Sequence, residues 1–163
     1  MKKKMVNLLV KKLNFSIKLV NEPLKQFIMA YKIDEIEGIG PMLASKLANA
    51  GVKTVEQLLE AGATKSGRKK LAEATGIDEG KLLTWVNMAD LFRIKGIGQE
   101  YSELLEAAGV DTVKELRTRN AANLHAKMEE VNEKKKLTRA LPALKTVEGW
   151  IEYASTLDAK VTY

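Results

Sequence analysis

The chain has 163 residues, of which 45% are hydrophobic, and it carries a formal net charge of +6 with an isoelectric point near 9.4. This hydrophobic share is ordinary for a globular protein. Because the chain contains no cysteine, its composition excludes disulfides, thiolate chemistry and zinc–thiolate sites. No apolar run approaches the length of a membrane span, so we expect a cytoplasmic protein.

The first 28 residues differ from the rest in charge. They hold seven lysines and a single acid, Glu22, so basic and acidic residues are equal in number over residues 29–163. Apolar residues recur three and four apart over residues 6–27, which is typical of an amphipathic helix, although Pro23 falls near its end. This basic amphipathic extension could contact an acidic membrane surface, grip DNA, or be an upstream extension with no selected role.

A Gly-Ile-Gly turn over residues 36–40 is the next feature. Pro41 stands where the first residue of a helix would be, and apolar residues then recur at helical spacing until Gly51. Glycines leave the backbone of the turn bare, and the N–H groups of the following helix carry the positive end of its dipole. The sequence therefore predicts an anion site made of backbone groups.

Helical signals continue after this turn. Thr54 is a good N-cap, which predicts a helix over residues 55–60 that Gly62 closes. A basic helix over residues 65–75 and a helix around Trp85 follow. No segment alternates with period two for long enough to indicate a strand, so we predict an all-α fold.

The second half repeats the first. Residues 94–116 follow the pattern of residues 36–58 in register, and a lysine-rich helix predicted from residue 123 to about residue 139 then precedes a closing tryptophan helix. The pattern indicates an internal duplication, with one unit over residues 29–92 and the other over residues 93–163. The repeated pairs include Ile36 and Ile94, Gly38 and Gly96, Gly40 and Gly98, Leu47 and Leu105, Thr54 and Thr112, and Trp85 and Trp150.

Residues 36–47 resemble the helix-hairpin-helix motif, because a hydrophobic-Gly-hydrophobic-Gly hairpin is followed by a small residue, Ala44, four positions beyond its second glycine. From residue 29 onward the chain resembles a family of small bacterial proteins, a domain of unknown function, built from tandem helix-hairpin-helix (SAM-like) units. The resemblance to the helix-hairpin-helix motif implies that the hairpin amides hold a DNA backbone phosphate without reading bases, whereas the resemblance to the small bacterial family implies a fold and no established activity. The segments that carry the closer resemblance are residues 29–33, 85–92, 124–127 and 161–163.

The two hairpins differ in their surroundings. No acid lies between Gly40 and Gly51, whereas three glutamates follow the second hairpin at helical spacing. We therefore expect the first hairpin to bind phosphate and the second to be weaker or purely structural. By resemblance, the first site comprises Gly38, Ile39, Gly40 and Pro41, with Lys46 as the supporting charge, and the second comprises Gly96, Ile97 and Gly98.

Two clusters of basic residues are candidates for additional support. Runs of charge are more often solvated helix faces than binding surfaces. The candidates are Lys65, Arg68, Lys69, Lys70, Lys134, Lys135, Lys136 and Arg139.

These patterns predict a non-enzymatic protein that binds double-stranded DNA independently of sequence. The alternative is a protein-interaction scaffold that keeps the fold without nucleic-acid contacts, which the balanced charge of residues 29–163 would allow. Basic side chains around the first hairpin would favour DNA, and carboxylates would favour the scaffold. His125 is the single histidine and has no partner for metal binding or catalysis, so we expect no metal, cofactor or small-molecule substrate.

Overall fold

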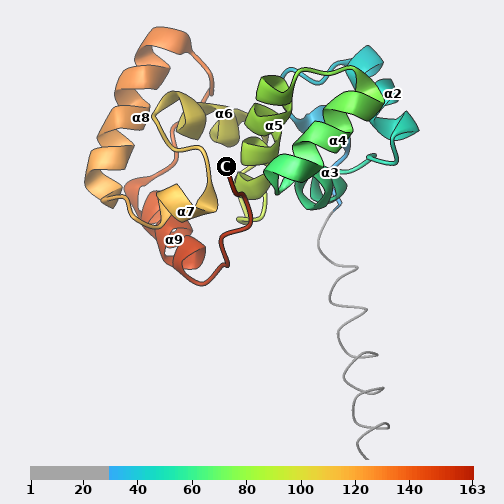
Figure 1. Cartoon of the computed structure of the whole chain (residues 1–163). Helices are drawn as coiled ribbons and strands as arrows, with labels where there is room; N and C mark the ends of the chain where they lie inside the picture. Colours follow the sequence, from blue (N-terminus) through green and yellow to red (C-terminus); the bar gives the residue numbers. More distant parts are fainter. Residues whose placement is uncertain (1–29) are drawn as a thin grey trace, which may run out of the picture. The chain divides into compact units, whose positions relative to one another are not determined.

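The computed structural model describes residues 30–163, which confirm the predicted all-α class (Figure 1). These residues form eight α-helices and no strand. The helix predicted over residues 6–27 lies outside the described part of the chain. In chain order the elements are the 3-10 turn η1 (Ile33–Glu35) and the helices α2 (Pro41–Asn49), α3 (Val55–Gly62), α4 (Lys65–Thr75), α5 (Glu79–Leu91), α6 (Gln99–Ala107), α7 (Val113–Leu116), α8 (Ala121–Lys135) and α9 (Leu144–Ser155).

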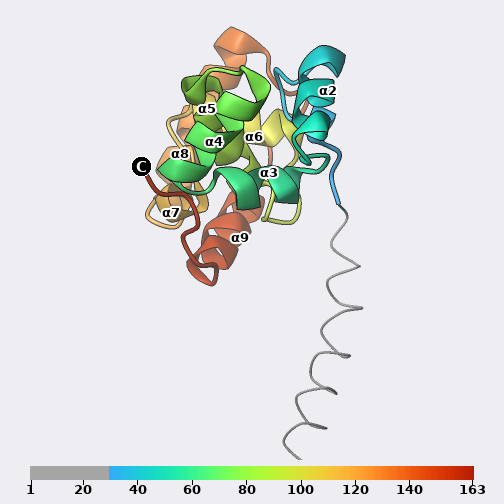
Figure 2. The same cartoon turned by 45° about the vertical axis from the view of Figure 1, so that its right-hand side comes forward.

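The helices enclose two hydrophobic cores, and Figures 1 and 2 show the two groups that they form. Helices α2 to α5 surround the first core, which includes the fully buried Leu58, and helices α6 to α9 surround the second, which includes Leu104. The C-terminal half of α5 contributes to both cores, with Trp85 in the first and Leu91 in the second. This helix therefore joins the two groups through buried apolar side chains.

Both predicted N-caps are confirmed. The side-chain oxygen of Thr54 accepts a hydrogen bond from the N–H of Gln57 at 3.2 Å, and the side chain of Gln57 accepts one from the N–H of Thr54 in return. At the start of α7, the Thr112 hydroxyl accepts from the N–H of Glu115 at 3.4 Å. These contacts satisfy N–H groups that have no partner inside the helix, which is why α3 and α7 begin where the sequence predicts.

Gly51 ends α2 as predicted, with a φ of +86° that suits glycine. Gly62, in contrast, lies within the last turn of α3 instead of beyond it. A Cβ atom at Gly62 would lie 2.4 Å from a methyl carbon of Val86. The glycine therefore permits the close approach of α3 to α5, and its role is in packing.

The lysine-rich helix is shorter than predicted. Helix α8 ends at Lys135, and Lys136 takes a left-handed conformation with φ 54°. The side chain of Asn132 accepts from the N–H of Thr138 at 2.9 Å and donates to its carbonyl oxygen at 3.0 Å. These bonds turn the chain away from the helix, so Arg139 lies in the following loop.

The C-terminal segment, residues 156–163, runs from α9 back to the first core. Arg93 donates to the carbonyl oxygen of Asp158 at 2.9 Å, and Val161 is buried in the first core. The N–H of Thr162 donates to the carbonyl oxygen of Ala63 at 2.8 Å. The end of the sequence thus completes the packing of residues that lie near its middle.

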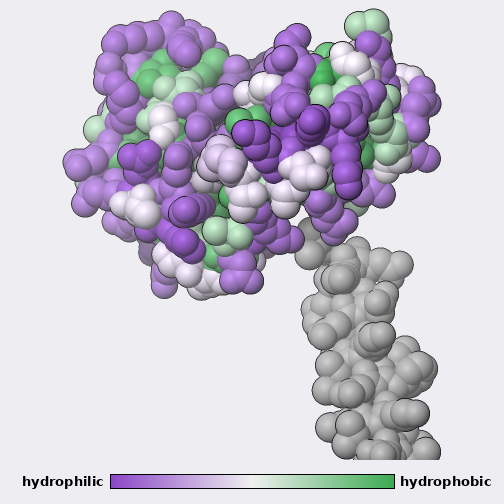
Figure 3. Space-filling view, in the orientation of Figure 1, coloured by the Kyte–Doolittle hydropathy of each residue, from purple (hydrophilic) through white to green (hydrophobic). Residues whose placement is uncertain are grey.

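The surface seen in Figure 3 is mostly hydrophilic, with small and separate apolar areas. Within residues 30–163, no helix combines the length and the apolar character that crossing a membrane requires. Among the described residues, the exposed large apolar side chains are Met42, Leu144, Tyr153 and Tyr163.

Candidate functional site

The first glycine turn, residues 36–40, is fixed by its own backbone and by the first core. The N–H of Ile39 donates to the carbonyl oxygen of Ile36 at 3.1 Å, and both side chains are buried. Gly38 has a φ of +87°, which β-carbon-bearing residues rarely adopt. The sequence predicts that the N–H of Ile39 faces a phosphate. The turn itself uses this N–H, so it is not available to a ligand.

Helix α2 starts at this turn with open backbone donors. No side chain caps it, and its first turn contains no acid. The N–H groups of Gly40, Met42 and Leu43 have no acceptor among the described residues, whereas Pro41 has no N–H to offer. A Cβ atom at Gly40 would meet no atom within 4 Å. The start of α2 is therefore a bare, accessible group of donors at the positive end of a helix dipole.

Lys46 lies at the other end of α2. It is exposed and belongs to the last turn of the helix, where a positive charge favours the helix dipole. It stands six positions after Gly40, which corresponds to about 9 Å along the helix axis. Side chains in a helix lean toward its N-terminus, so the ammonium group can approach the start of α2 from the side without lying over it.

The second glycine turn, residues 94–98, has the same backbone geometry. The N–H of Ile97 donates to the carbonyl oxygen of Ile94 at 3.0 Å, and Gly96 has a φ of +93°. Gly98 precedes α6 without a capping side chain, and a Cβ atom there would also meet nothing within 4 Å. The two turns therefore present similar backbones, and the difference between them lies in the side chains.

Three glutamates follow the second turn along α6, and one of them lies in the first turn of the helix. Glu100 lies in the first turn of α6, where its charge opposes the approach of an anion. Burial raises the pKa of Glu103, and the charge of Glu37 raises it further against the opposing effect of Lys135. The pKa of Glu106 is also raised, first by burial and then by neighbouring acids that include Glu103. An anion at this turn would meet the charge of Glu100 first, while Glu103 and Glu106 lie farther along α6.

A hydrogen bond joins the two turns. The side-chain amide of Gln99, the first residue of α6, donates to the carboxylate of Glu37 in the first turn. The charge of Glu37 also raises the pKa of Glu103, one turn farther along α6 from Gln99. The carboxylate of Glu37 therefore lies next to Gln99, the residue that follows the second turn.

Each turn packs against the indole of a buried tryptophan. A Cβ atom at Gly38 would lie 3.2 Å from Nε1 of Trp85, and one at Gly96 would lie 3.4 Å from Nε1 of Trp150. The two indoles are only 5% and 4% exposed. They support the turns from inside and leave no face for a base to stack on.

The basic residues predicted as support do not form one surface. Helix α4 packs on α3 and α5, whereas α8 packs on α6 and α9. Arg68 is buried and bonds only to backbone carbonyl oxygens, so it is not available to contact a DNA phosphate. Lys134 is paired with Glu130 at 2.7 Å. The candidates that are exposed and form no ion pair among the described residues are Lys65, Lys69 and Lys70 on α4 and Lys135, Lys136 and Arg139 at and beyond the end of α8.

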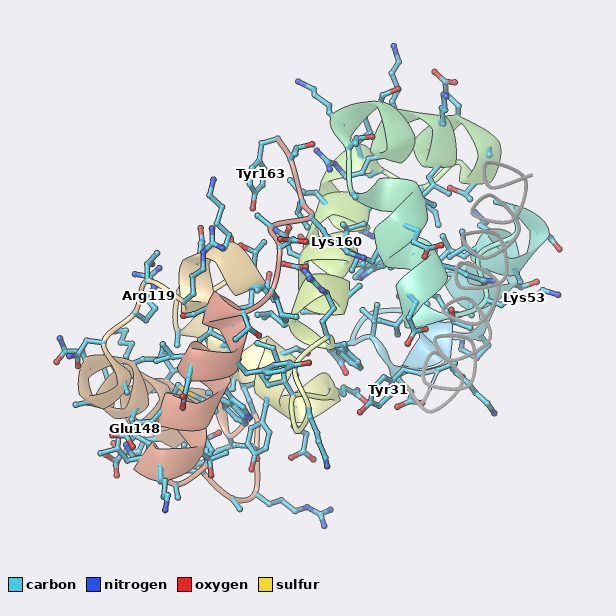
Figure 4. All side chains as sticks on the ribbon, turned by 90° about the horizontal axis from the view of Figure 1, so that it is seen from below. Tyr31, Lys53, Arg119, Glu148, Lys160 and Tyr163 are labelled. Atoms are coloured by element: carbon cyan, nitrogen blue, oxygen red, sulfur yellow. The ribbon has the colours of Figure 1, made fainter. Side chains whose placement is uncertain are left out.

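His125 and the surface hollow near Arg119 are the other candidate sites in the described part of the chain, and neither has an arrangement of side chains typical of metal binding or catalysis. The ring of His125 contacts the carbonyl oxygen of Pro142 at 2.9 Å, and residues 30–163 contain no group of three metal-ligating side chains. A shallow hollow of about 300 Å³ lies near Arg119 and Lys127. Figure 4 shows Arg119 and Glu148 in the group of α6 to α9, far from Lys53 and Tyr31 in the other group.

Sequence analysis did not single out Glu37 and Gln99, whose bond joins the two turns, or the buried Asp90, which bonds to Arg93 and to the N–H of Val113. An acid among apolar residues of a helix was a signal for Asp90. No local signal marks the contact of Glu37 with Gln99.

The fold and the turns define an all-α protein with two glycine-turn helix starts. The chain belongs to the family described as a domain of unknown function, DUF4332, whose model matches residues 37–157. Comparison with curated proteins finds no match, and comparison with solved structures finds none either.

Proposed function

We propose that residues 29–92 and 93–163 are two helix-hairpin-helix (SAM-like) units related by internal duplication. The support is the agreement of the two turns in backbone and surroundings. Gly38 and Gly96 have φ values of +87° and +93°, and each lies against the indole nitrogen of a buried tryptophan. Threonine caps the helix that follows in both halves. Superposing the halves on these elements would test the relationship.

We further propose that the first hairpin binds the phosphate backbone of double-stranded DNA, without catalysis, cofactor or base recognition. The observation that carries this proposal is the start of α2, where the N–H groups of Gly40, Met42 and Leu43 lack acceptors among the described residues and Gly40 leaves open space. Backbone donors at a helix start suit a phosphate and give no sequence information. Lys46 supplies the nearest charge on the same helix.

The second hairpin has a different role in this proposal. Its glycines shape the same turn, but Glu100 occupies the first turn of α6 and Glu103 and Glu106 follow. The charge of Glu100 repels phosphate at short range, and Glu103 and Glu106 add weaker repulsion from farther along the helix, which a single helix dipole offsets only in part. We assign to Gly96, Ile97 and Gly98 the task of holding the second core together.

A protein-interaction scaffold is the second candidate. It is favoured by the position of Glu37, whose carboxylate lies next to the acids of α6, and by the equal numbers of basic and acidic residues over residues 29–163. Exposed Met42 beside the first hairpin would then be a contact for a protein partner.

A salt titration distinguishes the two candidates. Residues 29–163 are mixed with a labelled short duplex, and fluorescence anisotropy is recorded at several salt concentrations and with duplexes of unrelated sequence. One or two phosphate contacts predict weak binding with a log–log salt slope of about −1 to −2. Equal affinity for all sequences supports backbone binding. The absence of binding at low salt, or a strong preference for one sequence, would contradict the DNA proposal.

A further inference from the structure

Arg68 is a buried cation whose bonding partners are all backbone oxygens. It is 4% exposed, and it donates to the carbonyl oxygens of Gly62 at 2.9 Å, Ala63 at 3.2 Å and Thr162 at 2.7 Å. Among the described residues, no carboxylate forms an ion pair with it. Two of the three acceptors belong to the end of α3, and the third comes from the C-terminal segment.

The C-terminal segment meets this site through the backbone of Thr162 and the side chain of Val161. The N–H of Thr162 donates to the carbonyl oxygen of Ala63 at 2.8 Å, while its own carbonyl oxygen accepts from Arg68. The preceding residue, Val161, is 8% exposed and packs in the first core. Figure 4 shows the segment, with Lys160 and Tyr163 labelled, passing between the two groups of helices. Recognition therefore uses one apolar side chain and both backbone groups of the next residue.

Releasing this segment would leave specific groups without partners. Arg68 would lose its shortest hydrogen bond, and the hole filled by Val161 would open in the first core. Buried polar groups that lose a partner, and cavities in a packed core, are both costly. The emptied site would thus retain affinity for any segment of the same chemistry.

We propose that Arg68, the carbonyl oxygen of Ala63 and the Val161 hole form a peptide-binding site, and that its intermolecular ligand is the C-terminal segment of a second copy of this chain. Within one molecule the segment fills the site as an internal ligand. Exchange between two molecules replaces each contact by an identical one, so it requires no new complementarity. This inference is independent of the proposed DNA binding.

The experiment uses two full-length variants with complementary defects. Val161→Asp spoils the segment but keeps the site, because a carboxylate cannot fill an apolar hole without loss of hydration. Arg68→Met removes the hydrogen-bond donors of the site and leaves the C-terminal segment unchanged. The probe is a labelled peptide with the sequence of residues 157–163, and the control is the same peptide carrying Val161→Asp. Binding is measured by anisotropy, and folding by circular dichroism.

We expect the probe to bind Val161→Asp at least ten-fold more tightly than it binds the unmodified protein, in which the attached segment competes at high effective concentration. The control peptide should not bind. Mixing the two variants should give a one-to-one complex in size-exclusion chromatography, whereas each variant alone should remain monomeric.

Several results would overturn the proposal. One is a folded Val161→Asp variant that fails to bind the probe, or that binds probe and control alike. If Val161→Asp is unfolded, adding the probe should restore its helical signal, and failure to do so also contradicts the site. Probe binding without a complex between the two variants would rule out the second copy as the ligand.

Discussion

The carboxylate of Glu37 accepts a hydrogen bond from the side-chain amide of Gln99, which links the first glycine turn to the start of α6. Both side chains belong to exposed residues, so the contribution of this bond to stability is about 1 kcal/mol or less. The main consequence of this bond is that it fixes where the negative charge of Glu37 lies. The acid of the first turn is held beside Glu103, and the first turn of α2 has no acid of its own.

Replacing Gly40 with valine should weaken DNA binding if the first hairpin holds phosphate. A side chain there meets no protein atom within 4 Å, and the backbone φ of −78° suits any residue. It would instead stand in the space through which a phosphate approaches the amides. We expect a loss of about ten-fold, the equivalent of one charged hydrogen bond, in the anisotropy titration.

Gly98→Val is the matched control, because Gly98 also precedes a helix, lacks a positive φ and has open space at its Cβ position. Its effect on DNA affinity should be much smaller, while both variants should lose similar stability from a poorer N-cap. Equal losses of affinity at both positions, with folding intact, would contradict the assignment of the site to the first hairpin.

Removing Asp90 should strongly destabilise the fold. This carboxylate is 1% exposed, and it accepts from the N–H of Val113 at 2.9 Å and from Arg93 at 2.7 Å. Asp90→Ala leaves the N–H of Val113 without an acceptor and leaves Arg93 with only the carbonyl oxygen of Asp158, and breaking such a buried pair costs about 3–5 kcal/mol. Denaturant unfolding followed by circular dichroism measures the change.

Glu130→Ala serves as the control for a solvent-exposed ion pair. Glu130 pairs with Lys127 and Lys134 on the surface of α8, and these lysines lower its pKa to about 2. The variant should change the unfolding midpoint at neutral pH very little, because exposed pairs are well screened by water and salt. A loss as large as that of Asp90→Ala would show that surface charge, and not the buried bond to Val113, dominates stability.

Mild acidification should stabilise the region around α6. Burial, followed by the charges of Asp111 and Glu103, raises the pKa of Glu106 above its ordinary value of 4.5. A carboxyl group with a raised pKa binds more protons in the folded state than in the unfolded state, so the free energy of unfolding increases as the pH falls through the raised value. Glu106→Gln should therefore raise the melting temperature at pH 7.

The same substitution should also reduce the gain in melting temperature between pH 7 and pH 5. Glu73→Gln, at an exposed position on α4, is the control and should preserve that gain. If Glu106→Gln lowers the melting temperature at pH 7 instead, the charged form of Glu106 makes a stabilising contact that outweighs its burial.

Removing residues 1–28 should sharply reduce affinity for polyanions. The segment holds seven of the 27 basic residues and only one acid, whereas the remaining chain has balanced charge. Fewer neutralised phosphates release fewer counterions, so the salt slope should flatten. Unchanged binding by residues 29–163 would assign the affinity to the hairpins, and unfolding would show that the described core requires the segment.

The sequence by itself determined the features that depend on contacts between near neighbours. The two glycine turns, the caps at Thr54 and Thr112 and the end of α2 at Gly51 occur where it predicts them. Each rests on the backbone preference of one residue or on a hydrogen bond that spans three or four residues. Such interactions can be predicted from a short stretch of sequence, as can the helical spacing of apolar residues.

Only the tertiary structure decided which charged residues serve the fold and which face solvent. Arg68 belongs to a basic run, but packing buries it, and one of its acceptors, the carbonyl oxygen of Thr162, lies 94 residues away. Likewise, Glu37 meets Gln99 across 62 residues. A charge pattern gives no information about such pairings, because burial and distant acceptors depend on how the helices pack together.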